Sequence, residues 1–257
     1  MTRLDVELVR RGLVASRTRA RAAILAGSVL VEGNVVTRAA QEVGAGAKVE
    51  VSHEQRYVSR AAHKLLGALA DTGLRPRGRA LDAGASTGGF TQVLLECGCA
   101  SVYAFDVGHG QIAATLREDP RVRVREGLNL RDLVLADVDD EPVDVLVADV
   151  SFISLKLLLA PLLAVLRPDG WALLLVKPQF EVGRERLGEG GIVTDPRHRA
   201  ESVAGIVAAA AELGWPARWT GESRLPGAGG NVEYFALLSR SVAAEGGDGE
   251  VPDRVRP

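Results

Sequence analysis

The sequence is poor in cysteine and histidine and has no long apolar run, and each shortage excludes a class of protein. Its two cysteines, Cys97 and Cys99, are too close together for an ordinary disulfide and too few for a thiolate metal site. The four histidines show no metal-ligand spacing. The most apolar window, 157–166, is ten residues long, whereas a bilayer-spanning helix needs roughly 18–20 residues. A disulfide scaffold, a zinc ribbon and an integral membrane protein are therefore excluded.

What is present is enough for a buried core. Hydrophobic residues make up 47% and charged residues 25% of the 257 residues, a balance typical of globular domains rather than disordered chains. No apolar stretch of signal-peptide length follows Met1. We therefore expect a cytoplasmic protein of one or two domains, with no membrane partner and no bound metal.

Charge is distributed unevenly along the chain. Residues 1–60 hold ten Lys and Arg against six Asp and Glu, and the remainder holds 21 against 27. A basic module attached to an acidic one suggests that the first meets a polyanion such as a nucleic acid. An ordinary solvated surface is the alternative.

The basic segment predicts a small α+β unit. Leu4 and Leu8 share one helical face before Gly12, and Ser16 can cap a second helix. Residues 29–36 then turn back through a Gly-Asn pair that favours a tight hairpin. Two helices and a small sheet bury little surface, so we interpret this segment as an accessory domain.

A pattern of arginines, glycines and small apolar residues in this segment carries a family resemblance: Arg3-Leu4-Asp5, Gly12-Leu13, Ser16-Arg17, Ala20, Ile24, Gly27, Val29, Val31 and Gly33. It resembles the RNA-binding fold of small-subunit ribosomal protein S-four, in which the second helix and the turn before it face RNA. The resemblance implies RNA-binding arginines, with a solvated helix surface as the alternative for each. With two arginines from the rest of the chain, the candidates are Arg3, Arg11, Arg17, Arg19, Arg60 and Arg131.

From about Arg60 the sequence alternates between strands and helices. The predicted strands are 80–82, 102–105, 122–124, 143–149, 172–176, 217–220 and 232–238. The predicted helices are 89–96, 112–117, 155–166 and 199–213. This order indicates a mostly parallel, Rossmann-like seven-stranded α/β sheet covered on both faces. Ligands of such sheets bind beyond the carboxyl ends of the strands.

A glycine-rich loop, 82–90, follows the first of these strands and opens a helix. Asp106 follows the second strand and can accept hydrogen bonds from ribose hydroxyls. Enzymes that use nicotinamide dinucleotides and enzymes that use S-adenosylmethionine share an acidic residue at this position. Asp82 would repel a pyrophosphate, and neither Gly-x-Gly-x-x-Gly nor Tyr-x-x-x-Lys occurs, so S-adenosylmethionine is favoured. The expected cofactor-binding residues are Asp82, Gly84, Ala85, Ser86, Thr87, Gly88, Gly89, Phe90, Asp106 and Asn129, the last with a structural turn as an equal alternative.

Four charged residues lie at or near the ends of predicted elements: Lys64, Asp149, Lys177 and Glu233. Asp149 opens Asp-Val-Ser-Phe, which differs from the Asn/Asp-Pro-Pro-aromatic motif of base N-methyltransferases. The four resemble the Lys-Asp-Lys-Glu tetrad of ribose 2′-O-methyltransferases such as the FtsJ family. Together with the amino-terminal segment, the resemblance narrows to the TlyA family of ribosomal RNA 2′-O-methyltransferases, which also carry the older name haemolysin. It implies methyl transfer from S-adenosylmethionine to a cytidine ribose in ribosomal RNA or ribosomal subunits.

The tetrad has residue types suited to this reaction. A ribose hydroxyl is a poor nucleophile, so a positioned base must take its proton. A lysine can do so only while its amine is neutral, which burial and a neighbouring cation favour. Our hypothesis makes Lys177 the base, Lys64 a substrate positioner, and Asp149 and Glu233 groups that orient the amines. Each residue taken singly also has a structural alternative. Asp149 could cap a helix, Lys177 could be a solvated strand end, and Glu233 could be a cross-strand partner.

The sequence also predicts domain limits. These are an RNA-binding domain over 1–52, a linker over 53–60, a methyltransferase domain over 61–240 and a disordered tail over 241–257. Residues 180–199 are expected to form a loop over the site. Two other functions stay open, a membrane-lysing protein and an RNA-binding protein with an inactive methyltransferase fold. The oligomeric state is left open.

Overall fold

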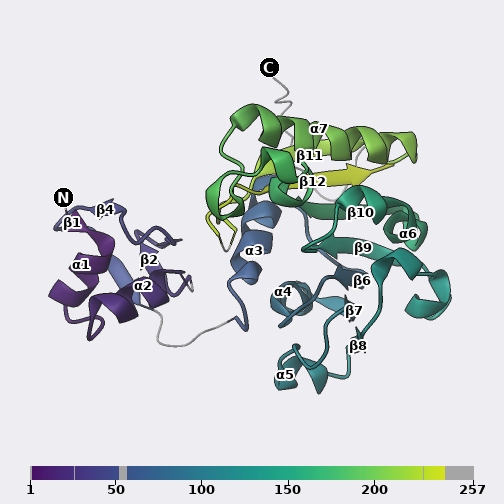
Figure 1. The fold of residues 1–257 in the computed structure, drawn as a ribbon. Coiled ribbons are helices and arrows are strands. Elements are labelled where there is room, and N and C mark those ends of the chain that lie inside the picture. Colours follow the sequence, from purple (N-terminus) through teal and green to yellow (C-terminus); the bar gives the residue numbers. More distant parts are fainter. Residues whose placement is uncertain (1, 26, 52–56, 228, 241–257) are drawn as a thin grey trace.

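The computed structural model describes residues 2–25, 27–51, 57–227 and 229–240, which form two domains (Figure 1). The amino-terminal domain packs its two helices against short strands around a core that includes Leu4, Leu8, Ala20 and Ile24. The predicted helices and hairpin are confirmed, while an additional antiparallel pair, β1 with β4, was not predicted. Its elements are β1 (Thr2–Arg3), α1 (Leu4–Arg10), α2 (Arg17–Leu25), β2 (Val29–Val31), β3 (Asn34–Val35), β4 (Glu42–Val43) and β5 (Val49–Val51).

The second domain is built on a seven-stranded sheet, as predicted, with the order β11-β12-β10-β9-β6-β7-β8. Its strands are β6 (Gly78–Ala83), β7 (Cys99–Asp106), β8 (Val122–Glu126), β9 (Val143–Ala148), β10 (Leu166–Val176), β11 (Ala217–Glu222) and β12 (Tyr234–Ser239). Only β12 runs antiparallel to its neighbours, β10 and β11. The α-helices are α3 (Ala61–Thr72), α4 (Gly89–Cys97), α5 (Ala114–Arg117), α6 (Leu159–Ala164) and α7 (Pro196–Glu212).

Helices cover both faces of this sheet. Successive strand residues point to opposite faces, and in β9 Val145 packs with the α3 and α4 side whereas Leu146 packs with the α6 and α7 side. Because both faces are buried, the central strands are continuous apolar runs rather than alternating ones. This explains why the strands could be located from sequence.

The chain leaves the centre of the sheet in opposite directions, toward β7 from β6 and toward β10 from β9. A crevice forms at the carboxyl ends of strands that diverge in this way. Gly84, just after β6, has a φ of +85°, and a Cβ built on it would lie 2.8 Å from the backbone oxygen of Asp149. Glycine at this position therefore lets the loops after β6 and β9 approach each other closely.

Two predicted segments differ from the structure. The predicted helix 155–166 divides into a 3-10 turn, η3 (Leu155–Leu157), and the short α6, because β10 already begins at Leu166. The predicted loop 180–199 contains the turns η5 (Arg184–Arg186) and η6 (Glu189–Gly191) and the start of α7. Asp195 caps that helix by accepting a hydrogen bond of 2.8 Å from the Arg197 amide.

The predicted linker and tail fall largely outside the described residues. Linker positions 53–56 and the tail 241–257 are not described. Residues 57–60 belong structurally with the second domain, since the Tyr57 hydroxyl donates to Glu96 of α4 at 3.0 Å. The Val58 amide likewise donates to the Gln92 side chain at 3.0 Å.

Candidate active site

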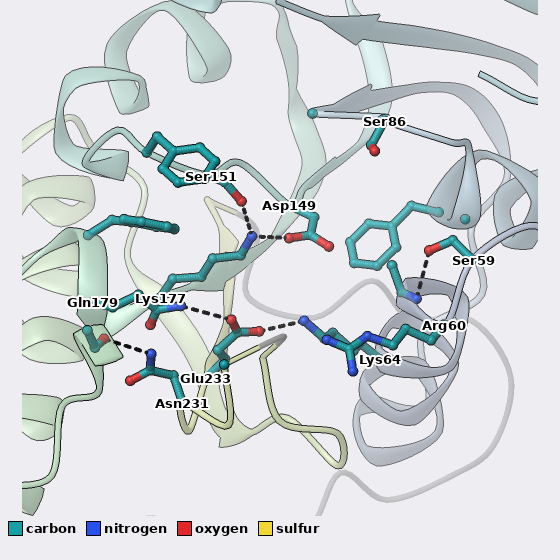
Figure 2. A pocket seen from close by; sticks show the side chains of 18 of the residues that line it. Ser59, Arg60, Lys64, Ser86, Asp149, Ser151, Lys177, Gln179, Asn231 and Glu233 are labelled. Atoms are coloured by element: carbon teal, nitrogen blue, oxygen red, sulfur yellow. Dashed lines mark hydrogen bonds and ion pairs between the residues drawn. The ribbon is translucent and has the colours of Figure 1, made fainter. Parts of the chain in front are cut away.

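A cavity of about 550 Å³ opens at the carboxyl ends of the central strands. Lys64 reaches it from α3, Asp149 from the end of β9, Lys177 from the end of β10, and Glu233 from the residue before β12 (Figure 2). The structure thus brings all four predicted tetrad residues together. The cavity is of the size that commonly holds a small-molecule ligand.

The tetrad consists of two ion pairs. Lys64 Nζ lies 2.6 Å from Glu233 Oε2, and Lys177 Nζ lies 2.6 Å from Asp149 Oδ1. Lys64, Lys177 and Glu233 are all buried. Buried charges are tolerated when they are paired and hydrogen-bonded, so each pair fixes its amine at a defined point of the cavity wall.

Two polar neighbours of the tetrad were not predicted. Lys177 Nζ donates to Ser151 Oγ at 2.7 Å (Figure 2), and Gln179 Nε2 donates to Glu233 Oε1 at 3.1 Å. Ser151 lies two residues after Asp149, and Gln179 lies two after Lys177. Both follow closely a tetrad residue at the carboxyl end of a strand, where ligands of such sheets bind, and this position is the sequence signal that could have identified both.

Two oxygen atoms contact the side-chain amine of Lys177. A neutral amine has two N–H groups and one lone pair in a tetrahedral arrangement. Ser151 Oγ accepts a hydrogen bond from Nζ at 2.7 Å, and Asp149 Oδ1 lies 2.6 Å from Nζ as its ion-pair partner. In its neutral form, an amine at this position can take a proton from a group bound in the cavity.

The glycine-rich loop contributes Gly84, Ala85, Ser86, Gly89 and Phe90 to the same cavity wall. The other predicted cofactor residues do not line the cavity: Asp82, Thr87, Gly88, Asp106 and Asn129. Of these, Gly88 is the N-cap of α4 with a φ of +97°, so it shapes the turn rather than the wall.

Asp82 is fully buried behind the glycine-rich loop. The Thr91 hydroxyl donates to its Oδ2 at 2.6 Å, and among the described residues its Oδ1 has no hydrogen-bond partner. Burial raises the pKa of this carboxyl from 3.8 to about 7, with the negative charge of Asp149 adding to the rise. An orphaned buried carboxylate oxygen beside the loop fits a cationic ligand in the adjoining space.

Asp106 and Asn129 organise neighbouring turns. Asp106 accepts hydrogen bonds from the Ser86 amide at 2.8 Å and from the Gly108 amide at 2.7 Å. Asn129 accepts one from the Arg131 amide at 3.2 Å and so caps the 3-10 turn η1 (Leu130–Asp132). Asp106 therefore holds the glycine-rich loop, and the turn at Asn129 follows β8 at the same edge of the sheet.

Two aromatic rings stand at the mouth of the cavity. Phe152 and Phe180 both line it, and their ring centroids are 5.2 Å apart. Phe152 is 91% exposed and has a φ of +66°. An exposed ring on a backbone conformation unfavourable for a non-glycine residue is a feature typical of ligand-binding sites.

The predicted RNA-binding arginines lie in different settings. Arg60 lines the cavity, whereas Arg131 is exposed on η1 and Arg19 is exposed on α2. Arg3 and Arg17 both contact Asp5. Arg11 is only 21% exposed and donates to Glu7 and to the Ala47 carbonyl.

Comparison with known proteins identifies both domains. Residues 57–240 match the FtsJ-like methyltransferase family, and residues 2–49 match the S4 domain family. The chain is 47% identical over 251 residues to the 16S/23S rRNA (cytidine-2′-O)-methyltransferase TlyA of Mycobacterium tuberculosis, covering 95% of this chain and 93% of the relative. This chain belongs to the TlyA family. The resemblance seen in the sequence is thereby confirmed.

Other members of the TlyA family carry a different name. Hemolysin A of Brachyspira hyodysenteriae is 38% identical, over 91% of this chain and 98% of its own length. The solved structure of a hemolysin-named protein from Streptococcus thermophilus is 36% identical with a TM-score of 0.72, covering 94% of this chain and 89% of that one. In the described part of this chain, no helix has the length and apolar character needed to cross a membrane.

Proposed function

We propose that this protein transfers a methyl group from S-adenosylmethionine to the ribose 2′-hydroxyl of a cytidine in ribosomal RNA. The observation that carries the proposal is the convergence of Lys64, Asp149, Lys177 and Glu233 on one cavity beside a glycine-rich loop. The name of the Mycobacterium tuberculosis relative supports the choice of cytidine and of ribosomal RNA.

The residues around the glycine-rich loop fit S-adenosylmethionine, which supplies a methyl group already activated on a sulfonium. Gly84 and the backbone that follows it would lie along the cofactor, since Gly84, Ala85 and Ser86 line the cavity. Asp106 would receive the ribose hydroxyls and Asn129 the adenine. Asp82 would face the cationic end through its unpartnered oxygen.

Lys177 is the proposed base. Its Nζ would accept the proton of the 2′-hydroxyl while the ribose oxygen bonds to the methyl carbon. The bond between that carbon and the sulfonium sulfur would break in the same step, with neutral S-adenosylhomocysteine as the leaving group. Ser151 holds the amine by a hydrogen bond, and Asp149, its ion-pair partner, would stabilise the ammonium that results. Lys64 and Glu233 would position the ribose. Glu233 holds Lys64 by an ion pair and is itself held by a hydrogen bond from Gln179.

The aromatic pair gives the target base a place to stack. Enzymes that modify one nucleotide of folded RNA take it out of its stack, and aromatic side chains hold unstacked bases. Phe152, exposed at the cavity mouth against Phe180, supplies such a platform. The S4 domain would select the RNA by shape before that step.

The test is methyl transfer from tritiated S-adenosylmethionine to unmethylated ribosomal subunits, with mapping of 2′-O-methyl groups in their RNA. Lys177→Ala should lower the rate by about 10²–10⁴-fold, the usual contribution of a general base, while cofactor affinity stays within a few-fold. Lys156→Ala, which removes an exposed lysine outside the cavity, is the matched control and should keep full activity.

The other candidate functions give different results. An RNA-binding protein with an inactive fold would bind subunits without transferring tritium. Methyl groups found on bases rather than riboses, or a Lys177→Ala variant with near-normal turnover, would contradict the proposed reaction and the proposed base respectively.

A further inference from the structure

Two carboxylates of α1 are buried under arginines in the S4 domain. The side chains of Asp5 and Glu7 are 0% and 1% exposed. Asp5 accepts hydrogen bonds from Arg3 Nε at 3.0 Å, Arg3 Nη2 at 3.1 Å and Arg17 Nη2 at 3.0 Å. It therefore joins the first turn of α1 to the first residue of α2.

This arrangement holds two guanidinium groups close together at the surface. Arg3 Nη2 and Arg17 Nη2 both contact Asp5 Oδ2, each at about 3 Å, so the two nitrogens are at most about 6 Å apart. The Arg3 and Arg17 side chains are nonetheless 49% and 60% exposed. Arg3 uses its Nε–Nη2 edge for Asp5, and within the described chain its Nη1 has no protein partner.

We propose that Asp5 is a positioning residue for RNA binding, which presents Arg3 and Arg17 as one preformed clamp for backbone phosphates. The proposal rests on the proposed function, because it takes ribosomal RNA as the polyanion. The outward edges of the two guanidinium forks supply the paired donors that phosphate oxygens accept.

The balance of charge and order makes this role specific. Asp5 lowers the net charge of the cluster from +2 to +1, which by itself weakens attraction to RNA. However, the Asp5 carboxylate also offsets the repulsion between the Arg3 and Arg17 guanidinium groups. It thereby fixes these two long side chains before RNA binds. Ordering a flexible side chain on binding costs affinity, so fixing it beforehand strengthens binding. The hydrogen bonds from Arg3 hold the pKa of Asp5 at about 2, so the carboxylate is ionised at neutral pH.

Glu7 provides an internal comparison with a different role. It accepts hydrogen bonds from Arg10 and Arg11, but Arg11 also donates to the carbonyls of Ala47 at 2.6 Å and Ala45 at 3.0 Å. Both terminal nitrogens of the Arg11 guanidinium thereby donate to carbonyls of the loop before β5, while its Nε donates to Glu7. Glu7 and Arg11 tie α1 to that loop, which is a structural function.

The deciding variant is Asp5→Asn. If Asp5 positions the two arginines, the variant should bind RNA more weakly, whereas if Asp5 only contributes a negative charge, the variant should bind RNA more tightly. We would measure binding of the full-length protein to isolated ribosomal subunits by fluorescence anisotropy over a salt series. Loss of the clamp should weaken binding about tenfold, the loss of one good charge-assisted contact, and flatten the salt dependence by about 0.7 per lost phosphate contact. If only charge matters, removing a carboxylate should tighten binding and steepen the salt dependence. Glu50→Gln removes an exposed carboxylate of the same domain and is the matched control.

A second measurement separates positioning from folding. In a double-mutant cycle, Arg17→Ala should cost RNA affinity alone, and adding Asp5→Asn to it should cost much less than in the wild type. Glu7→Gln should destabilise the S4 domain more than it changes the salt dependence. Unchanged or tighter binding by Asp5→Asn, or fully additive effects in the cycle, would overturn the proposal. Failure of the wild type itself to bind or methylate subunits would instead overturn the proposed function.

Discussion

At the scale of single residues, Ser151 gives a direct test of how Lys177 is held. Ser151→Ala removes the hydrogen-bond acceptor of the Lys177 amine and leaves only its ion-pair partner Asp149, so the amine is held less firmly in the cavity. We expect kcat to fall roughly ten- to a hundredfold with little change in KM, because the group acts on proton transfer. Ser151→Thr, which keeps the hydroxyl, should restore most of the rate, and Ser154→Ala in the same loop should leave it unchanged. A rise in KM alone would show that Ser151 contacts substrate instead.

Asp82 makes stability depend on pH in an unusual direction. Its pKa is raised in the folded protein to about 7 from 3.8, so the folded state holds the proton more tightly than the unfolded state. Its contribution is therefore fully present below about pH 4 and is lost as the pH rises through 7.

Asp82→Asn removes this titration and should change stability accordingly. The variant should gain stability relative to wild type between pH 4 and 7, by up to about 4 kcal/mol, and the difference should level off above pH 7. Urea unfolding at several pH values, followed by tryptophan fluorescence, measures it. A constant difference across that range would mean that Asp82 is ionised in the folded protein.

At the scale of elements, Gly84 decides how closely two strand ends meet. Gly84→Ala combines a φ of +85° with a Cβ placed 2.8 Å from the Asp149 backbone oxygen. We expect a loss of roughly 1–3 kcal/mol in stability and at least a tenfold loss of activity, since Asp149 would move. Gly73→Ala shares the positive φ but meets no atom within 4 Å, so it should cost stability without costing activity. Equal activity losses in both variants would show that steric contact is not the cause.

Much of the sheet and the tetrad could be predicted from the sequence, for definite physical reasons. Strand segments buried on both faces are apolar runs, as in residues 145–148 of β9 and 172–176 of β10, and functional residues follow their carboxyl ends. The prediction of one helix over 155–166 was wrong in its extent. A short apolar run occurs in helices and in strands alike, so hydrophobicity does not show where the helix ends and β10 begins. The two-residue strands β1 and β4 are too short to carry any alternation.

Side-chain partners across long separations could not be predicted either. Whether Arg11 faces RNA or a carbonyl depends on a loop 36 residues away, to which it donates through Ala47. Asp5 and Glu7 in a basic segment look like solvated charges, whereas the structure buries both of them. Composition counts charges but does not show which of them face each other.

At the scale of the whole molecule, the two domains should respond to acid in opposite ways. The carboxyls of Asp5 and Glu7 have pKa values of about 2, held below 3.8 and 4.5 mainly by hydrogen bonds from Arg3 and Arg10. Such groups stabilise the fold above about pH 4.5, and this contribution is lost as the pH falls toward 2. Asp82 in the methyltransferase domain favours the folded state over the same acidic range.

We therefore expect the S4 domain to unfold first on acidification. All three tryptophans, Trp171, Trp215 and Trp219, lie in the methyltransferase domain, so their fluorescence reports that domain alone. Hydrogen exchange of peptides from α1 and α2, corrected for the intrinsic pH dependence of exchange, reports the other. Exchange in α1 and α2 should accelerate between pH 4.5 and 2 before the fluorescence changes.

Replacing both acids, in Asp5→Asn/Glu7→Gln, should remove that acid-specific step while lowering stability at pH 7. A single transition shared by both probes would mean that the domains unfold as one unit and that the buried carboxylates do not set the order.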